Sequence, residues 1–222
     1  MSKYLIHTGQ KRKWYVDEYL YPSLLEQGIK EKDIIIHLDN KGVGTIQAYV
    51  DSFEKLPDTG YTWHLQDDII ISPDFKEVTE KQEDEQWVIC TFNSYYDKKL
   101  KEGFVASKDM WYSFPCIGIP NRVGKDCMRW IQECMIGNIA YKKYWERGNC
   151  VDWFFKQYVR DVATDIKVLN LVPNIVNHVD WLLGGSTIRQ IPREKPAVSM
   201  HWDYPELVKE LEEKIKCHYG QQ

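Results

Sequence analysis

The sequence predicts a single-domain α/β protein whose central, mainly parallel sheet is flanked by helices. Strand-like and helix-like stretches alternate through the first half in the order β-α-β-α-β, as expected when each helix crosses over between two parallel strands. With 222 residues, 43% of them hydrophobic, the chain can bury one sizeable core. No internal repeat, low-complexity segment or linker divides it.

In the first half, hydrophobic periodicity and breaker residues locate each element. An apolar run at 33–38 is typical of a buried parallel strand, and Gly28 ends the helical pattern that precedes it. Pro57 and Gly60 then separate a helix from the following strand. We therefore expect strands at 4–7, 33–38 and 61–65, with helices at 14–26 and 45–56.

The second half is less regular, and its segment 103–120, rich in glycine, proline and aromatic residues, predicts no definite element. Cys127 and Cys134 lie on one face of a predicted helix, where they are expected to be small buried side chains. The remaining predictions are strands at 87–92 and 166–171, helices at 125–136 and 151–162, and a charged, peripheral C-terminal helix at 205–217.

Composition argues against several functional classes. The six cysteines form no C-x-x-C pair, so a zinc module has little support. The net charge of −4 does not indicate a general nucleic-acid binder, although local basic clusters such as Lys11-Arg12-Lys13 could attract phosphate. No apolar run approaches the length of a membrane span, and the N-terminus lacks signal-peptide features. We expect a cytoplasmic protein with reduced thiols.

Three polar clusters follow the first three predicted strands. They are Thr8-Gly9-Gln10 with Arg12, residues 39–44, and Gln66-Asp67-Asp68. Because the carboxyl ends of parallel strands meet at one edge of the sheet, these clusters are expected to converge there and bind a ligand.

The acidic cluster has two readings. Adjacent carboxylates repel one another, and a hard divalent cation such as Mn²⁺ or Mg²⁺ holding a diphosphate removes that repulsion. The alternative is an acidic turn before a helix with Ser72 as its N-cap and Pro73 in its first turn. The position of the cluster after a β-α-β-α-β unit favours the metal.

Two spaced motifs resemble a known family. Leu65-Gln66-Asp67-Asp68 followed by Pro73-Asp74-Phe75 is similar to the LQDD…DF signature of phage-encoded glycosyltransferases of the GT-A fold. The later residues 172–178 and 184–188 resemble their PSLVQH…GxSLI segment, with Asn174 in place of serine and a longer interval that carries Trp181. The resemblance spans about residues 4–190 and implies transfer of a sugar from a nucleotide donor.

The resemblance also implies roles for individual residues. Asp68 would be the main carboxylate ligand of Mn²⁺ or Mg²⁺, and His178 a later ligand or a contact to the diphosphate. Gln66 and Asp67 would contact the metal shell or the donor ribose, while Thr8, Gly9, Arg12, Asp39 and Gly44 would line the donor site. Trp181, Gly185 and Ser186 would belong to the acceptor or sugar pocket.

Asp152 is the candidate catalytic base for an inverting transfer, which needs a carboxylate to take the acceptor proton. Alternatively, Asn149 could be the N-cap of the helix and Asp152 the N3 acid of a capping pair. If the enzyme retains configuration, it need have no such base. Weaker rivals for the same role are Asp126, Asp161, Asp165 and Asp180.

The family resemblance leaves the acceptor open. Phage enzymes that this sequence resembles often glycosylate hydroxymethylated pyrimidines in phage DNA, so DNA is a candidate acceptor beside cell-envelope polysaccharide or protein, with a UDP-sugar as the favoured donor. A nucleotidyltransferase or a non-catalytic nucleotide-sugar-binding module are the rival classes. We assign 1–200 to the glycosyltransferase domain, with donor half 1–100 and acceptor half 101–200, and 201–222 to a peripheral helix.

Overall fold

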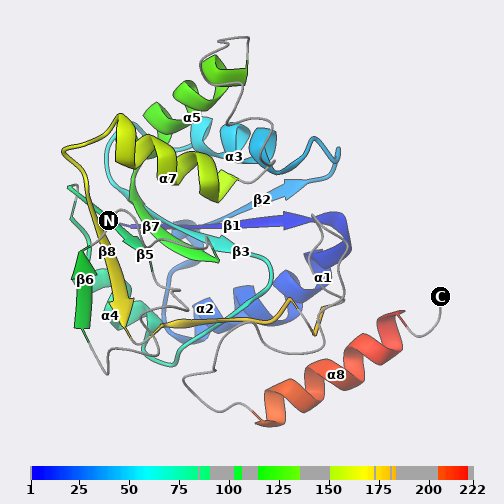
Figure 1. Cartoon of the computed structure of the whole chain (residues 1–222). Coiled ribbons are helices and arrows are strands. Elements are labelled where there is room, and N and C mark those ends of the chain that lie inside the picture. The colour runs from blue at the N-terminus through cyan, green and yellow to red at the C-terminus, as the bar shows by residue number, and fades with distance from the viewer. Residues whose placement is uncertain are drawn as a thin grey trace.

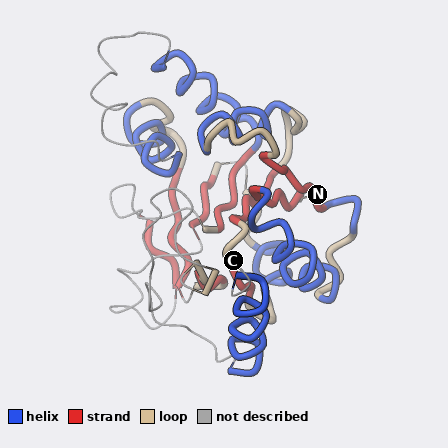
Figure 2. The backbone as a smooth tube through the Cα atoms, turned by 90° about the vertical axis from the view of Figure 1, so that its right-hand side faces the viewer, coloured by secondary structure: helices blue, strands red, loops and turns tan. Residues whose placement is uncertain are grey.

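A computed structural model describes residues 2–84, 86–90, 103–106, 115–135, 151–172, 174–180, 182–183 and 205–219. These residues form a central seven-stranded sheet with helices on both faces (Figure 1). They also form a small two-stranded sheet. The turned view shows the strands lying between two groups of helices (Figure 2). The predicted α/β class is therefore confirmed.

The central sheet is mainly parallel, as predicted. Its order is β2 (Ile34–Asp39), β1 (Lys3–Gly9), β3 (Tyr61–Gln66), β7 (Cys116–Pro120), β5 (Trp87–Cys90), β8 (Lys167–Val172) and β6 (Gly103–Ala106). Strands β1, β2, β3, β5 and β8 run in one direction, and only β7 and β6 run against them. The carboxyl ends of β1, β2 and β3 consequently lie side by side.

One face of the sheet is covered by α3 (Thr45–Glu54), α5 (Asn121–Met135) and α7 (Val151–Asp161) (Figure 1). Alternation along β1 sends Leu5 toward this layer and Ile6 toward the other, and both side chains are fully buried. Helices α3 and α5 approach closely because Gly124 leaves room for the ring of Phe53. Cys127 and Cys134 are buried in the same layer, as expected.

The opposite face is covered by a continuous helical stretch and by α4 (Phe75–Lys81). The stretch consists of a 3₁₀ turn (Gln10–Arg12), α1 (Lys13–Tyr15), a π-helical turn (Val16–Leu20) and α2 (Tyr21–Glu26). Helix α8 (Pro205–Tyr219) lies on the outside of this stretch, with Leu211 fully buried and Lys214 Nζ 3.0 Å from Glu18 Oε2. No helix in these described segments combines the length and apolar character of a bilayer span.

The small sheet is the main element that the sequence did not predict. Strand β4 (Ile69–Ile71) pairs antiparallel with β9 (Val176–His178), with Ile69 opposite His178. The N–H of Val179 also donates to the carbonyl of Asp68 at 2.8 Å. The alternative reading, a helix capped by Ser72, is wrong, because Ser72 follows β4 and α4 begins only at Phe75, without a side-chain cap.

The remaining differences have tertiary causes. The unassigned segment 103–120 contains β6 and β7, which pair with β8 and with β3 and β5. Helix α5 begins at Asn121, before the predicted residue 125, because Asn121 Nδ2 donates to the carbonyl of Thr59 and Oδ1 accepts from Thr62 Oγ1. Neither partner belongs to the helix, so hydrophobic periodicity could not place this boundary.

Candidate functional site

The predicted polar clusters do meet at the carboxyl ends of β1, β2 and β3. Gly9 is in register with Asp39 on β2, and its N–H donates to Asp67 Oδ2 at 3.2 Å, just beyond β3. The hydroxyl of Thr8 donates to the carbonyl of Gly9 at 3.2 Å. The sheet edge thus joins residues from three strand ends, as the topology predicts.

Arg12 is buried against the acidic pair and does not project from the surface. Its side chain is 3% exposed, and Nη1 lies 3.2 Å from Asp67 Oδ1 while also contacting Asp68 Oδ2. The 3₁₀ turn that follows β1 aims the guanidinium back at the strand ends. The predicted phosphate-binding arginine is therefore, in this structure, the counter-ion of the two carboxylates.

The other oxygen of Asp68 faces His178. Asp68 Oδ1 lies 3.1 Å from His178 Nε2, and His178 Nδ1 lies 3.5 Å from Asp180 Oδ1. Asp180 is the most buried of the three side chains at 1% exposed, compared with 10% for Asp68 and 14% for His178. The pairing of β4 with β9 creates this contact, since it places Asp68 next to the end of β9. The structure thus brings Asp68 and His178 together, and their role as metal ligands stays a prediction.

Burial and neighbouring charges give Asp67 and Asp68 different pKa values. Burial raises the pKa of Asp67 to about 6, with the charge of Asp68 acting in the same direction and Arg12 opposing it. Burial alone would also raise the pKa of Asp68, but His178 and Arg12 together hold it well below its ordinary value. For His178, the nearby carboxylates of Asp68 and Asp180 outweigh burial and raise the pKa. Asp68 is therefore the more firmly ionised member of the pair.

Gln66 and Asp152 lie on the other side of the sheet edge, near Tyr49 of α3. Gln66 is the last residue of β3. Burial raises the pKa of Tyr49, and the nearby charge of Asp152 contributes in the same direction. Asp152 is half-buried in the first turn of α7, and its Oδ1 accepts a hydrogen bond from Trp153 N at 2.9 Å.

Asp39 and Gly44 organise the loop between β2 and α3. The carboxylate of Asp39 accepts hydrogen bonds from the N–H groups of Val43 (3.0 Å) and Gly44 (3.4 Å). Gly44 has φ +90°, a conformation that favours glycine, and it immediately precedes α3. Both residues lie at the predicted sheet edge, and their predicted contact with a donor stays a prediction.

Three predicted pocket residues, Trp181, Gly185 and Ser186, lie outside the described residues. The sequence interpretation missed Tyr49 and gave Asp180 only a minor place as a rival base. Three consecutive isoleucines at 69–71 are a β-strand signal that could have indicated β4. Nothing in the spacing alone could have paired that strand with residues 176–178.

The donor set fits a divalent cation only in part. Two ligands bound at right angles with metal–ligand distances of about 2.1 Å lie about 3 Å apart. The 3.1 Å separation between Asp68 Oδ1 and His178 Nε2 is close to that value. Within the described part of the chain, no three His, Cys, Asp or Glu side chains gather as a complete metal site. These residues could thus supply two ligands, and a bound ligand or water would supply the rest.

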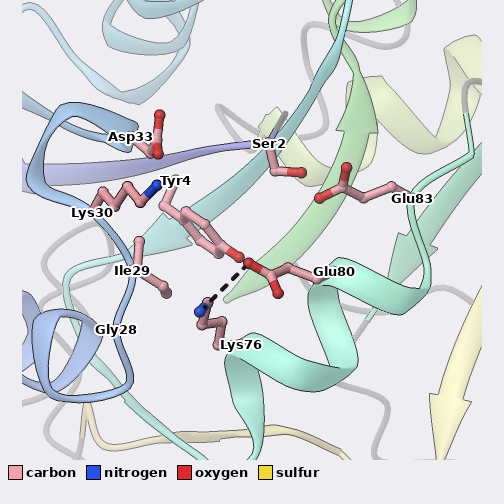
Figure 3. Close-up of a pocket in the computed structure, with 9 residues that line it drawn as sticks. All are labelled: Ser2, Tyr4, Gly28, Ile29, Lys30, Asp33, Lys76, Glu80 and Glu83. Carbon is pink, nitrogen blue, oxygen red and sulfur yellow. Dashed lines mark ion pairs between the residues drawn. The ribbon is translucent and has the colours of Figure 1, made fainter.

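A separate cavity of about 330 Å³ lies at the other end of β1 and does not belong to this site. Figure 3 shows its mixed charged lining around Tyr4, with Lys76 Nζ 3.8 Å from Glu80 Oε1. Asp33 in its wall is already paired with Lys3, at 2.7 Å. Since Lys76, Glu80 and Asp33 already pair with partners in the fold, the acidic sheet edge is the better candidate for chemistry.

No protein-family model matches the chain, and no curated protein is similar to it in sequence. Solved structures do resemble it. A complex of the galactosyltransferase LgtC with donor and acceptor sugar analogues covers 96% of both chains, at 11% identity and TM-score 0.46. A glycosyltransferase involved in glycosylation of the PBCV-1 major capsid covers 72% of this chain and 75% of its own, at 14% identity and TM-score 0.38. HddC from Yersinia pseudotuberculosis covers 57% and 80%, at 10% identity and TM-score 0.32. Similarities at this level do not assign a function, which is argued below from the site.

Proposed function

We propose that the protein is a metal-dependent glycosyltransferase of the GT-A type that moves a sugar from a nucleoside-diphosphate donor to an acceptor hydroxyl. The observation that carries the proposal is the contact between Asp68 Oδ1 and His178 Nε2, 3.1 Å apart at the carboxyl edge of a mainly parallel sheet. Their spacing suits two neighbouring ligands of one Mn²⁺ or Mg²⁺ ion.

The charge of the site supports a cation that arrives together with the donor. Among the residues that the structure describes, the carboxylates of Asp67, Asp68 and Asp180 contact two basic side chains, Arg12 and His178. A divalent cation bound together with the donor would offset the charge of these carboxylates and of the diphosphate. Because divalent cations at such sites are commonly held by one or two protein groups and by substrate phosphates, two protein ligands suffice.

Each of the site residues would have its own role in the reaction. A bound divalent cation would neutralise charge on the departing nucleoside diphosphate. Asp68 and His178 would hold it, Arg12 would keep the acidic pair in place, and the turn from Thr8 to Arg12 would border the nucleotide. Asp152, near Tyr49 and Gln66, is the proposed acceptor for the proton of the attacking hydroxyl. Residues 1–200 would form this catalytic domain, with Trp181, Gly185 and Ser186 in the sugar or acceptor pocket.

For the partners, we propose a UDP-sugar as donor and a 5-hydroxymethylpyrimidine in phage DNA as acceptor. The motif resemblance favours this acceptor, and cell-envelope polysaccharide or protein are the alternatives to be separated experimentally. The reaction class does not depend on this choice, because the donor site is argued from the sheet edge alone.

The decisive experiment separates sugar transfer from its rivals. The protein is incubated with Mn²⁺ and a panel of UDP-sugars, with and without hydroxymethylated DNA, and UDP, pyrophosphate and glycosylated product are measured. UDP release that requires Mn²⁺, is stimulated by an acceptor and is abolished by Asp68→Asn supports the proposal. Asp58→Asn, which removes a 90% exposed carboxylate that precedes β3, is a matched control that should behave like the wild type.

Other outcomes point to the rival classes. Pyrophosphate formation from a nucleoside triphosphate and a sugar phosphate would indicate a nucleotidyltransferase and overturn the proposal. Binding of UDP-sugar without turnover, unaffected by Asp68→Asn, would indicate a non-catalytic module. Against nucleotidyl transfer stands the place of His178 beside Asp68, since that reading assigns no role to the β9 segment.

A further inference from the structure

The cavity around Tyr4 lies at the amino end of β1, away from the acidic sheet edge, and has a volume of about 330 Å³. Part of its wall is rigid and apolar. Tyr4 and Ile29 are almost fully buried, and Tyr4 Oη is hydrogen-bonded to Thr79 Oγ1 at 2.9 Å. Small-molecule sites in proteins begin at about 300 Å³, so this cavity is large enough for a small ligand.

The segment between α2 and β2 fixes one side of the cavity. Gly28 follows α2 with φ +79°, a conformation that favours glycine, and its N–H donates to the carbonyl of Leu25 at 2.8 Å. The carbonyl of Lys30 then accepts from Asp33 N at 2.8 Å. These hydrogen bonds hold the backbone of Lys30 in the cavity wall.

Two charged side chains in the lining lack a partner. The other three are already paired within the fold, as described above. Within the part of the chain that the structure describes, neither Lys30 nor Glu83 forms a side-chain hydrogen bond or an ion pair. Figure 3 shows them on opposite sides of Tyr4. One unpaired cation and one unpaired carboxylate therefore line the cavity from opposite sides.

The Glu83 side of the cavity has further unmet polar capacity. Burial raises the pKa of Glu83 and the charge of Glu80 acts in the same direction, while the amino group at the start of the chain opposes both. Ser2 is 7% exposed, and its hydroxyl has no hydrogen-bond partner among the described residues. Figure 3 shows this hydroxyl directed toward Glu83. A ligand amine beside Glu83 would offset the carboxylate charge, and rotation of Ser2 would let its hydroxyl accept from the same amine.

We propose that this cavity binds a small zwitterion, whose ammonium group lies against Glu83 and whose phosphate or carboxylate lies against Lys30. A molecule with one charge would pair with only one of the two side chains, and an apolar molecule would pair with neither. The zwitterion is therefore the class of ligand that matches the lining. The site is separate from the acidic sheet edge, and the inference does not depend on the proposed glycosyltransferase activity.

Two matched sets of probes test the class of ligand in ¹H–¹⁵N spectra of the whole chain. Glucosamine 6-phosphate carries both charges, glucose 6-phosphate carries only the anion and glucosamine carries only the cation. The second set, 6-aminohexanoate, hexanoate and hexylamine, has a carboxylate in place of the phosphate. We expect a zwitterion to shift the amides of residues 28–33 and 76–83 and to bind about 10-fold more tightly than either singly charged analogue. The set that binds identifies the anionic group as phosphate or carboxylate.

Charge-removing variants assign the two ends of the ligand. Lys30→Gln should weaken binding of the zwitterion about 10-fold and abolish its advantage over the probe that carries only the cation. Glu83→Gln should weaken it to a similar extent and abolish its advantage over the probe that carries only the anion. Lys81→Gln and Glu77→Gln are the matched controls, because these exposed residues of α4 pair with each other and do not line the cavity. Both controls should bind like the wild type.

Three results would overturn the inference. One is the absence of amide shifts at the cavity with either zwitterion up to about 10 mM. Another is a set of shifts confined to residues 8–12 and 66–68, which would place the probes at the acidic sheet edge. The third is unchanged affinity in both Lys30→Gln and Glu83→Gln, with spectra that show each variant folded. Because no sugar transfer is measured, failure here leaves the proposed function standing, and loss of UDP-sugar turnover would leave this site standing.

Discussion

Nη1 of Arg12 lies 3.2 Å from Oδ1 of Asp67, and the same nitrogen also contacts Oδ2 of Asp68. One buried guanidinium therefore holds two adjacent carboxylates that would otherwise repel each other. The pKa of Arg12 is raised because Asp68 and Asp67 outweigh the opposing effect of burial. The arginine thus belongs to the framework of the site, whether or not it also contacts a donor.

Replacing Arg12 by methionine should destabilise the fold, because two buried carboxylates would lose their shared counter-ion. Removing one partner of a buried ion pair typically costs about 3–5 kcal/mol, and we expect a loss in that range in urea unfolding at pH 7.5. Arg129→Met, which removes a 69% exposed side chain from α5, should change stability by less than about 1 kcal/mol.

The double variant Arg12→Met/Asp68→Asn tests the cause of that loss. Arg12→Met leaves the carboxylates of Asp67 and Asp68 without their counter-ion, and Asp68→Asn removes one of these two charges. The combined destabilisation should therefore be clearly smaller than the sum of the two single effects. Strict additivity would show that the two side chains are not coupled, and would contradict the proposed framework role of Arg12.

The sequence could predict this cluster only in outline. Strand order brings Gly9 and Asp67 to the same edge, so their convergence followed from topology. The direction of Arg12 did not follow, because a local pattern cannot show whether an arginine after a strand points to solvent or folds back. His178 could be paired with Asp68 only through a family resemblance, since the β4–β9 contact that joins them is non-local. The proposed boundary at residue 200 stays a prediction.

Substituting Asp152 by asparagine should distinguish catalysis from a structural role in α7. If Asp152 takes the acceptor proton, kcat should fall by about 10²- to 10⁴-fold while the KM for the donor and the unfolding free energy change little. If it serves the helix N-terminus, activity should survive and stability should fall by about 0.5–2 kcal/mol. Asp58→Asn, which removes a 90% exposed carboxylate, is the control for the loss of a charge.

His7, His37 and His64 come from the neighbouring strands β1, β2 and β3 and lie under α3. Two of them, His7 and His64, should make the fold sensitive to acid. His7 Nε2 is 3.2 Å from His64 Nδ1, and the two rings stack on Tyr49 and Phe53. Burial lowers the pKa of His64 from 6.5 to about 3, and burial with neighbouring histidines lowers the pKa of His7. Both rings are therefore neutral in the folded protein at neutral pH.

The sign of the pH effect follows from these lowered pKa values. The unfolded chain binds protons below about pH 6.5 that the folded chain does not accept until much lower pH, so stability is full above 6.5 and declines toward pH 3. His64 alone should contribute a loss of about 2–3 kcal/mol by pH 4.5. In urea unfolding from pH 7.5 to 4.5, His64→Gln should show a shallower decline than the wild type. Parallel curves would contradict the assignment.

The docking of α8 yields a further prediction. Leu211 is fully buried, and Tyr19 Oη donates to Glu210 Oε1 at 3.1 Å. Truncating Leu211 to alanine should cost about 2–4 kcal/mol if α8 unfolds together with the rest of the chain. The exposed neighbour Glu212→Ala should have almost no effect. If α8 instead detaches independently, Leu211→Ala should leave global unfolding unchanged and accelerate amide exchange only in residues 205–219.

Gly124 provides the sharpest test of the packing that supports the sheet edge. A Cβ atom at this position would lie 1.9 Å from Cε1 of Phe53, so Gly124→Ala must push apart α5 and α3, and α3 is also the helix that carries Tyr49. Alanine normally favours a helix over glycine by about 1 kcal/mol, but forced overpacking costs about 1–3 kcal/mol or more, so the net effect should be destabilising. The exposed Glu133→Ala in α5 is the control in urea unfolding. Rescue of Gly124→Ala by Phe53→Leu, which removes the clashing ring, would establish the contact as the cause, whereas a stabilised Gly124→Ala would contradict the close approach of the two helices.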